Sequence, residues 1–240
     1  MRNIKDEPNL NQKKVLLRLD LNVPLNNGKI TDTTRIDKII PTISFLLKNN
    51  AKVIILSHVG RPKGKIVNEL SLKPICKNLE NKLNESVKLI TTNPKEINSN
   101  DLFNNQDEKI VMLENIRFYE EEEENNPTFA KHLASLADIY VNDAFSCSHR
   151  THASIYEITK EKINNAFTDA SKKQSIRILE ITMEKLVSID FNHNSASAII
   201  DASLTNVVGD KMGKISAWYD NEWGFSNRMC DIAEYLHEIS

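Results

Sequence analysis

The sequence predicts an α/β protein with a doubly wound, mostly parallel sheet over residues 1–159 and a smaller α+β unit over residues 160–240. The 240 residues are 40% hydrophobic and 27% charged, which is ordinary for a globular protein. Short apolar runs alternate with segments of helical spacing as far as about residue 159, which is typical of an α/β sheet. Beyond that point the alternation becomes irregular, which favours a separate, mixed unit.

The first elements follow from apolar runs and turn residues. A strand is expected over 15–24, and the Asn-Asn-Gly at 26–28 signals a tight turn after it. Apolar residues at helical spacing predict a helix over 33–49, in which Pro41 marks a break or the first turn of a second helix. The run "KVIILS" predicts a buried strand over 52–57.

The same alternation continues along the rest of the first unit. It predicts a helix over 71–84, a strand over 86–91, a polar linker near 93–108, a strand over 109–115, a helix over 126–137 and a strand over 138–145. Strands separated by helices imply right-handed crossovers and therefore parallel pairing. The run Glu120–Glu124 is interpreted as a solvated stretch before a helix, without a function.

The second unit is predicted from mixed patterning. It contains a helix over 161–173, strands over 185–192, 195–208 and 214–220, and an amphipathic helix over 222–239.

Composition excludes several function classes. A formal net charge of −2 provides no basic field for nucleic acid, and no apolar run approaches the length that spans a membrane. Three irregularly spaced cysteines suit a reducing cytoplasm rather than a disulfide framework. The six glycines form neither G-x-G-x-x-G nor G-x-x-x-x-G-K-[ST], so the two common nucleotide-phosphate cradles are absent.

Polar and cationic side chains follow the carboxyl ends of four predicted strands, where ligands of such sheets bind. In chain order they are Asp20 and Asn22, His58 and Arg61, Arg117, and Arg150 with its neighbours; Arg35 could join them. Arginines bind phosphate and carboxylate through paired, charge-assisted hydrogen bonds. A single arginine after a strand is usually a solvated loop residue, but repetition at four strand ends favours a small-anion site.

Five motifs identify a family resemblance over residues 1–159. "RLDLNVP", "TDTTRI", "SHVGRPKG", "LENIRFYEEEE" and "VNDAFSCSHRTHAS" resemble the Rossmann-like, N-terminal domain of phosphoglycerate kinase. The resemblance implies phosphoryl transfer between ATP and 3-phosphoglycerate, with magnesium on the nucleotide. It implies that 3-phosphoglycerate contacts Asp20, Leu21, Asn22, Arg35, His58, Val59, Gly60, Arg61, Arg117 and Arg150. Arg35 would also be catalytic, because it stabilises charge on the transferring phosphoryl group.

The sequence departs from that family after about residue 160. The nucleotide domain that should follow has no counterpart, so the site for ATP and magnesium is expected to be missing and activity to be weak or absent. Residues 160–240 instead resemble the C-terminal end of glyceraldehyde-3-phosphate dehydrogenase, through "LVSIDFNHNSASAIIDAS" and "AWYDNEWGFSNRM". That resemblance makes Asn221 a vestigial nicotinamide contact. NAD is not expected to bind, because the dinucleotide-binding half has no counterpart.

Three hypotheses remain open. The chain is a phosphoglycerate kinase-type enzyme with its substrate half intact, a non-catalytic chimera that binds 3-phosphoglycerate, or a remnant of an NAD-dependent dehydrogenase. The expected partner is the small molecule 3-phosphoglycerate, with no nucleic acid and no membrane. The sequence does not predict the oligomeric state.

Overall fold

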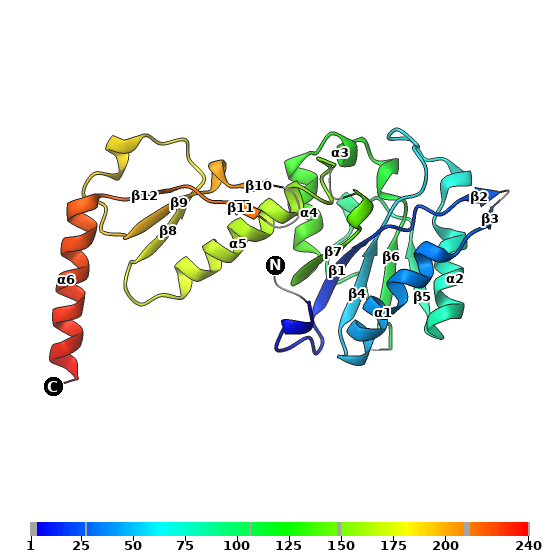
Figure 1. Cartoon of the computed structure of the whole chain (residues 1–240), viewed down its shortest axis with the longest axis horizontal. Coiled ribbons are helices and arrows are strands. Elements are labelled where there is room, and N and C mark those ends of the chain that lie inside the picture. Colours follow the sequence, from blue (N-terminus) through cyan, green and yellow to red (C-terminus); the bar gives the residue numbers. More distant parts are fainter. Residues whose placement is uncertain (1–3, 27, 106, 148–149, 209–211, 240) are drawn as a thin grey trace. The chain divides into compact units, whose positions relative to one another are not determined.

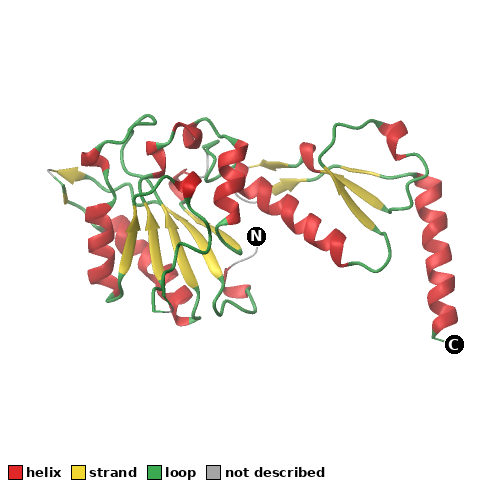
Figure 2. Cartoon of the chain, turned by 180° about the vertical axis from the view of Figure 1, so that it is seen from behind, coloured by secondary structure: helices red, strands yellow, loops and turns green. Residues whose placement is uncertain are grey.

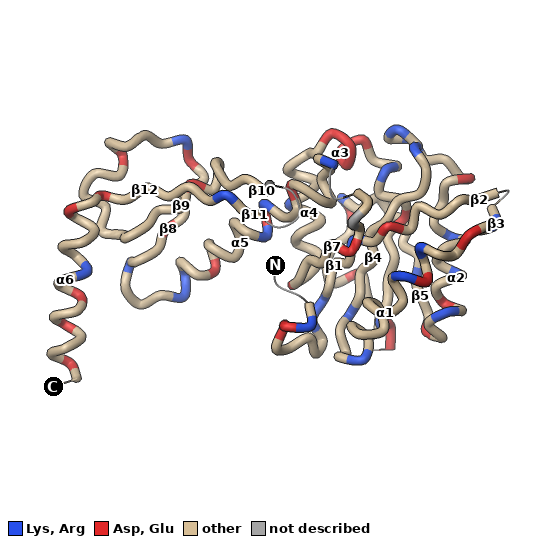
Figure 3. Tube along the Cα trace, viewed as in Figure 1, with Lys and Arg blue, Asp and Glu red and all other residues tan. Residues whose placement is uncertain are grey.

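The computed structural model describes residues 4–26, 28–105, 107–147, 150–208 and 212–239. The chain divides into two compact units, unit 1 (Met1–Thr159) and unit 2 (Lys160–Ser240). No helix in the described part of the chain is both long and apolar enough to cross a membrane. Charges of both signs are interspersed along the chain (Figure 3), in keeping with the net charge of −2.

A five-stranded parallel sheet in the order β5-β6-β4-β1-β7 forms the centre of unit 1 (Figures 1 and 2). Its strands are β1 (Lys14–Leu19), β4 (Lys52–Leu56), β5 (Val87–Ile90), β6 (Ile110–Leu113) and β7 (Ile139–Asp143). The short strands β2 (Leu25–Asn26) and β3 (Lys29–Ile30) pair antiparallel, as the Asn-Asn-Gly turn predicts. The expected α/β fold with a parallel sheet is therefore confirmed.

Helices cover both faces of this sheet. They are α1 (Thr34–Lys48), α2 (Lys73–Leu83), α3 (Glu120–Glu123) and α4 (Pro127–Ser135). Leu17 packs with residues of α1 and α2 in one core cluster, whereas its neighbour Leu16 packs with Phe129 of α4 in the other. Successive strand residues point to opposite faces, and burial of both faces explains why these strands are nearly continuous apolar runs.

Short 3-10 helices occupy several connections. They are η1 (Ile4–Asp6), η2 (Asn68–Leu70), η3 (Pro94–Glu96), η4 (Ile116–Phe118), η5 (Phe145–Cys147), η6 (Ser188–Phe191) and η7 (Ala202–Leu204). Several lie directly after strands, so they orient the side chains found at the strand ends.

Two predictions for unit 1 were wrong in detail. The helix over 33–49 is unbroken, with Pro41 exposed inside α1. Buried Ile39 and Ile43 lie on either side of the proline and hold both halves against the sheet, so packing overrides its local cost. The first strand ends at Leu19 rather than at residue 24.

Unit 2 is a smaller unit of mixed helices and strands. Its first helix is α5 (Glu157–Lys173), which begins three residues before the boundary between the units. Its three-stranded sheet has the order β12-β9-β8, with β8 and β9 parallel and β12 antiparallel to β9. The strands of the unit and its last helix are β8 (Leu179–Thr182), β9 (Ala198–Asp201), β10 (Asn206–Val208), β11 (Met212–Lys214), β12 (Ala217–Trp218) and α6 (Asn221–Glu238). The rings of Phe191 and Trp218 stack with centroids 5.1 Å apart in its small core.

Side-chain hydrogen bonds change the predicted strands of unit 2. The segment 185–192 contains η6 instead of a strand, because the Asp190 carboxylate accepts the Val187 amide at 2.8 Å. The segment 195–208 is split after β9, where the Asp201 carboxylate accepts the Ser203 amide at 3.1 Å. Such local bonds compete with strand pairing. In addition, the structure contains β8, a strand that the sequence did not predict.

Candidate anion-binding site

The loop after β4 is fixed to the end of β1 by hydrogen bonds. The Ser57 hydroxyl donates to the Leu19 carbonyl at 2.8 Å and accepts the Leu21 amide at 3.1 Å. Farther along, the Gly60 amide donates to the Asn22 side-chain oxygen at 2.9 Å. Gly60 has a φ of 66°, a left-handed conformation that glycine adopts without a steric cost. The two strand ends therefore form one rigid rim.

A cavity of about 260 Å³ lies at this rim. Its lining comes from the carboxyl ends of β1, β4, β6 and β7 and from α1: Asp20, Asn22, Arg35, His58, Gly60, Arg61, Arg117, Ser146, Cys147 and Arg150. The volume is below the roughly 300–1,000 Å³ of sites for drug-sized ligands, so it suits a small metabolite. We call these ten residues the anion cavity.

The structure thus brings together eight of the residues that the sequence singles out. The side chains of Leu21 and Val59 instead lie in the hydrophobic core, 0% and 3% exposed. They support the rim and do not line the cavity. Asn221 is the first residue of α6 in unit 2, where it is exposed.

Arg35 is held by Asp20, the only acidic residue of the anion cavity. Its guanidinium donates to the Asp20 carboxylate, and the Ser146 hydroxyl donates to the same carboxylate oxygen. Side-chain exposure of 46% leaves Arg35 accessible to a ligand. Ser146 was not predicted, because a serine in "FSCSH" carries no distinctive sequence signal.

Arg117 carries donors that no group of the described residues satisfies. Its side chain is 3% exposed, and one nitrogen, Nη1, donates to the Gly60 carbonyl at 3.1 Å. The other two, Nε and Nη2, are buried without a hydrogen-bond partner in the described structure, and the nearest carboxylate, on Glu123, lies 3.6 Å from Nε. Burial and then the charge of Arg150 lower the pKa of Arg117. Unpaired buried donors cost free energy, which an anionic ligand would recover.

His58 is a neutral hydrogen-bonding residue in this cavity. Its Nδ1 lies 3.0 Å from Nη2 of Arg18, and a guanidinium can only donate. Burial, followed by the charges of Arg18 and Arg117, lowers the pKa of His58 to about 2. The proton of the neutral ring must therefore be on Nε2, where it can serve as a donor.

Behind His58 lies a buried polar network that the sequence did not reveal. Arg18 is fully buried, and its Nε donates to the Ser154 hydroxyl at 3.0 Å. Glu122 accepts the Ser154 hydroxyl at 2.6 Å and the Ser154 amide at 2.8 Å. The interpretation of Glu120–Glu124 as a solvated stretch was wrong at Glu122, which is 0% exposed in α3. The arginine inside the apolar run "VLLRL", Arg18, was the sequence feature that could have predicted a buried charge here.

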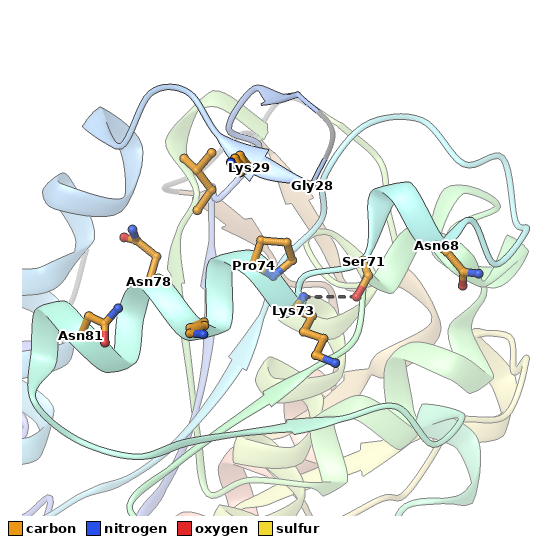
Figure 4. Close-up of a pocket in the computed structure, with 10 residues that line it drawn as sticks. Gly28, Lys29, Asn68, Ser71, Lys73, Pro74, Asn78 and Asn81 are labelled. Carbon is orange, nitrogen blue, oxygen red and sulfur yellow. Dashed lines mark hydrogen bonds between the residues drawn. The ribbon is translucent and has the colours of Figure 1, made fainter.

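A second cavity, of about 530 Å³, lies between β3 and α2 (Figure 4). Lys29, Lys73 and Lys77 line it together with asparagines, and all three lysines are exposed. It contains none of the residues that the sequence predicts for a site, and none of its lining residues is a buried cation. Across the described residues, no three His, Cys, Asp or Glu side chains are grouped to hold a metal ion.

Comparison with known proteins places the anion cavity in a family context. A family model described as phosphoglycerate kinase matches residues 4–184. The phosphoglycerate kinase of Wolbachia sp. subsp. Brugia malayi is 50% identical over 160 residues, which is 63% of this chain and 38% of the relative. That of Dictyoglomus turgidum is 50% identical over 151 residues, again 63% of this chain and 38% of the relative.

Solved structures give the same likeness. Phosphoglycerate kinase from Coxiella burnetii has a TM-score of 0.58 and 35% identity, covering 73% of this chain and 46% of that one. The enzyme from Pyrococcus horikoshii OT3 has a TM-score of 0.59 and 27% identity, covering 75% and 48%. This chain therefore spans less than half the length of these relatives.

The family match extends farther than the sequence motifs indicate. It continues past residue 159 through α5 and β8, whereas residues 185–240 lie beyond it. All four strand ends that line the anion cavity fall inside the matched region. Because the match covers well over half of its residues, this chain belongs to the phosphoglycerate kinase family.

Proposed function

We propose that this chain binds 3-phosphoglycerate in the anion cavity, as the substrate half of a phosphoryl transfer between ATP and 3-phosphoglycerate. The observation that carries the proposal is Arg117, whose buried Nε and Nη2 have no acceptor among the residues that the structure describes. A phosphate or carboxylate offers several acceptor oxygens to such donors. Four arginines against one aspartate in the lining also favour a ligand with more than one negative charge.

The proposed roles follow from the contacts of each group. Arg35, the proposed catalytic residue, is exposed beside Asp20 and would stabilise charge on the transferring phosphoryl group. Asp20 and Asn22 would contact the substrate hydroxyl, and His58 would donate from Nε2. Arg61, Arg117 and Arg150 would bind the phosphate and carboxylate, while Leu21, Val59 and Gly60 shape the rim.

Calorimetric titration of the purified chain with 3-phosphoglycerate tests this proposal, at low salt because the interaction is electrostatic. Saturable one-site binding is expected. Arg35→Ala and Arg150→Ala should each weaken it at least about tenfold, since a charge-assisted hydrogen bond contributes about 1.5–3 kcal/mol. Lys77→Ala, from the second cavity, is the matched control and should leave affinity unchanged. Unchanged affinity in both arginine variants would refute the site.

We further propose that these 240 residues alone transfer phosphoryl groups weakly or not at all. The six glycines form neither common phosphate cradle, and we assign no residue of this chain to ATP or magnesium. A coupled assay with ATP and 3-phosphoglycerate should detect little turnover while calorimetry detects binding. Turnover on the order of 10 per second, the median for enzymes, would overturn the proposal of weak or absent activity.

We also propose a cytoplasmic location. The free thiols of Cys76, Cys147 and Cys230 support it, because thiols stay reduced in the cytoplasm.

Residues 160–184 fall inside the phosphoglycerate kinase match, so the expected boundary at residue 160 was too early. For the remaining residues, 185–240, we propose an origin in a glyceraldehyde-3-phosphate dehydrogenase, which makes the chain a chimera. The motif "WYDNEWGFSNR" supports it, and the family model ends before this motif, at residue 184. Asn221, the vestigial nicotinamide contact, has no phosphate cradle beside it in sequence. NAD should therefore show no saturable binding in calorimetry, and a micromolar dissociation constant would favour the dehydrogenase remnant instead.

A further inference from the structure

One hydroxyl group lies between two buried charges behind the anion cavity. Nε of Arg18 donates to the Ser154 hydroxyl at 3.0 Å, and the same hydroxyl donates to Oε1 of Glu122 at 2.6 Å. All three residues are 0% exposed. Because a guanidinium has donors and no acceptor, the hydroxyl must accept from Arg18 and direct its own proton to Glu122. The orientation of the hydroxyl is therefore fixed.

Each nitrogen of the Arg18 guanidinium has an acceptor. Nε donates to the Ser154 hydroxyl, Nη1 donates to the Leu19 carbonyl, and Nη2 lies 3.0 Å from Nδ1 of His58. A guanidinium is a rigid, planar group, so the acceptors of Nε and Nη1 set the direction in which Nη2 points. The hydrogen bond that holds the His58 ring therefore depends on the Ser154 hydroxyl.

Glu122 is attached to the same segment as Ser154. The Ser154 amide donates to Oε2 of Glu122 at 2.8 Å, and the Ala153 amide donates to the Glu122 carbonyl at 3.0 Å. The carboxylate therefore stays in place when only the serine hydroxyl is removed. Opposite charges attract strongly where water is excluded, so Arg18 would then turn toward this carboxylate.

We propose that Ser154 is a positioning residue for ligand binding, whose hydroxyl keeps Arg18 directed at His58 so that the ring presents Nε2–H to the anion cavity. The inference rests on the proposed function, in which His58 donates from Nε2 to 3-phosphoglycerate. Ser154 is not among the ten lining residues of the anion cavity, so it acts through Arg18 and His58. Without the hydroxyl, Nδ1 of His58 loses its donor, and the ring can adopt either tautomer.

A change at Ser154 isolates this effect, because it leaves every charge in place. Ser154→Ala keeps both Arg18 and Glu122 ionised, whereas Glu122→Gln would also remove a negative charge from behind the cavity. An apparent dissociation constant scales inversely with the fraction of binding-competent molecules. If about a third of the rings keep Nε2–H directed into the cavity, the dissociation constant for 3-phosphoglycerate rises about threefold.

Calorimetric titration of the full chain with 3-phosphoglycerate tests the proposal. Ser154→Ala should raise the dissociation constant at least about threefold, and Ser154→Thr, which retains a hydroxyl, should restore most of the affinity. Tyr140→Phe is the matched control, because it removes a 2.6 Å hydrogen bond to the Ser154 carbonyl and leaves the hydroxyl in place. It should leave the affinity unchanged. An affinity of Ser154→Ala equal to that of the parent chain would overturn the proposal.

A double-mutant cycle shows whether Ser154 acts through the histidine. In a His58→Ala background, Ser154→Ala should weaken binding no further, because both changes affect the same hydrogen bond to the ligand. Effects of the two substitutions that simply add would mean that Ser154 acts on the site by another route, and would also overturn the proposal.

Nitrogen NMR of the histidine rings provides a readout that loss of stability alone does not change. In the parent chain the His58 signals, identified by their absence in His58→Ala, should show a protonated Nε2 and an unprotonated Nδ1. Ser154→Ala should lose this pattern. If that variant does not fold, Ser154→Cys replaces it, since a thiol is only a weak acceptor.

The two measurements also separate this inference from the proposed function. A parent chain that does not bind 3-phosphoglycerate would refute the proposed function, and the ring nitrogens would still decide the role of Ser154. A proton on Nδ1 of His58 in the parent chain, or an Nε2–H pattern that survives loss of the serine hydroxyl, would overturn the positioning role whether or not the ligand binds.

Discussion

Nη2 of Arg18 lies 3.0 Å from Nδ1 of His58, inside unit 1 and out of contact with solvent. The contact joins β1 to the loop after β4 and fixes the protonation state of the histidine. An arginine donor holds Nδ1 as an acceptor, so the ring presents an N–H to the anion cavity. The positive charge of the loop "SHVGRP" therefore comes from Arg61, while His58 contributes a neutral hydrogen-bond donor.

His58 should make the chain less stable in mild acid. Its pKa falls from 6.5 to about 2 on folding, so the unfolded state binds the proton first as the pH drops below 6.5. Stability therefore rises with pH in this range and is lost as pH falls, by about 1.4 kcal/mol per pH unit. His58→Asn, which keeps an acceptor for Arg18, should lose about 1 kcal/mol less between pH 6.5 and pH 5.5, because the unfolded histidine is only partly protonated in that interval. Urea unfolding followed by circular dichroism measures this, and parallel pH profiles would contradict it.

Removing the charge of Arg117 should weaken the binding of 3-phosphoglycerate while leaving the free energy of unfolding nearly unchanged. Arg117→Met eliminates two unpaired buried donors and the repulsion from Arg150, at the cost of one hydrogen bond to Gly60. We expect the free energy of unfolding to stay within about 1 kcal/mol of the parent, while 3-phosphoglycerate affinity falls more than about tenfold. Paired urea and calorimetric measurements decide it. A large loss of stability with retained affinity would show that Arg117 is structural.

Glu122 should matter far more than its neighbours in the acidic run. Glu122→Gln removes the charge that accepts two hydrogen bonds from Ser154 in the buried network, and should cost about 2 kcal/mol of unfolding free energy. Glu124 is exposed, so Glu124→Gln should change stability by less than about 0.5 kcal/mol. Chemical denaturation of the two variants provides the comparison. Equal effects would mean that burial of Glu122 is unimportant.

Gly60 should tolerate a side chain less well than Gly28. Both have positive φ, 66° and 72°, but an added Cβ at Gly60 would lie 2.7 Å from Leu70, whereas nothing lies within 4 Å at Gly28. Alanine at either position incurs about 1–2 kcal/mol of backbone strain, and Gly60→Ala must also displace Leu70. Thermal unfolding should therefore rank Gly60→Ala below Gly28→Ala. Equal melting temperatures would indicate that Leu70 moves aside without cost, and the reverse order would contradict the prediction.

The sequence determined the features that depend on short-range patterns. Alternating apolar runs specified a parallel sheet, Asn-Asn-Gly specified the turn between β2 and β3, and four strand ends specified where arginines would gather. Hydrophobic periodicity and turn residues act within a few positions of the chain, so both can be recognised in the sequence alone. The sequence also predicts the apolar spacing along α6, but it does not predict that these apolar side chains are exposed.

Tertiary structure decided which polar groups are buried and in what state. Arg18 meets Ser154 across 136 positions of the chain, and that contact, with Glu122 behind it, is what buries charges that a local pattern assigns to solvent. Tertiary structure also keeps His58 neutral and buries the side chains of Leu21 and Val59 in the core. Burial and electrostatic environment arise from residues far apart in sequence, so only the folded chain could decide them.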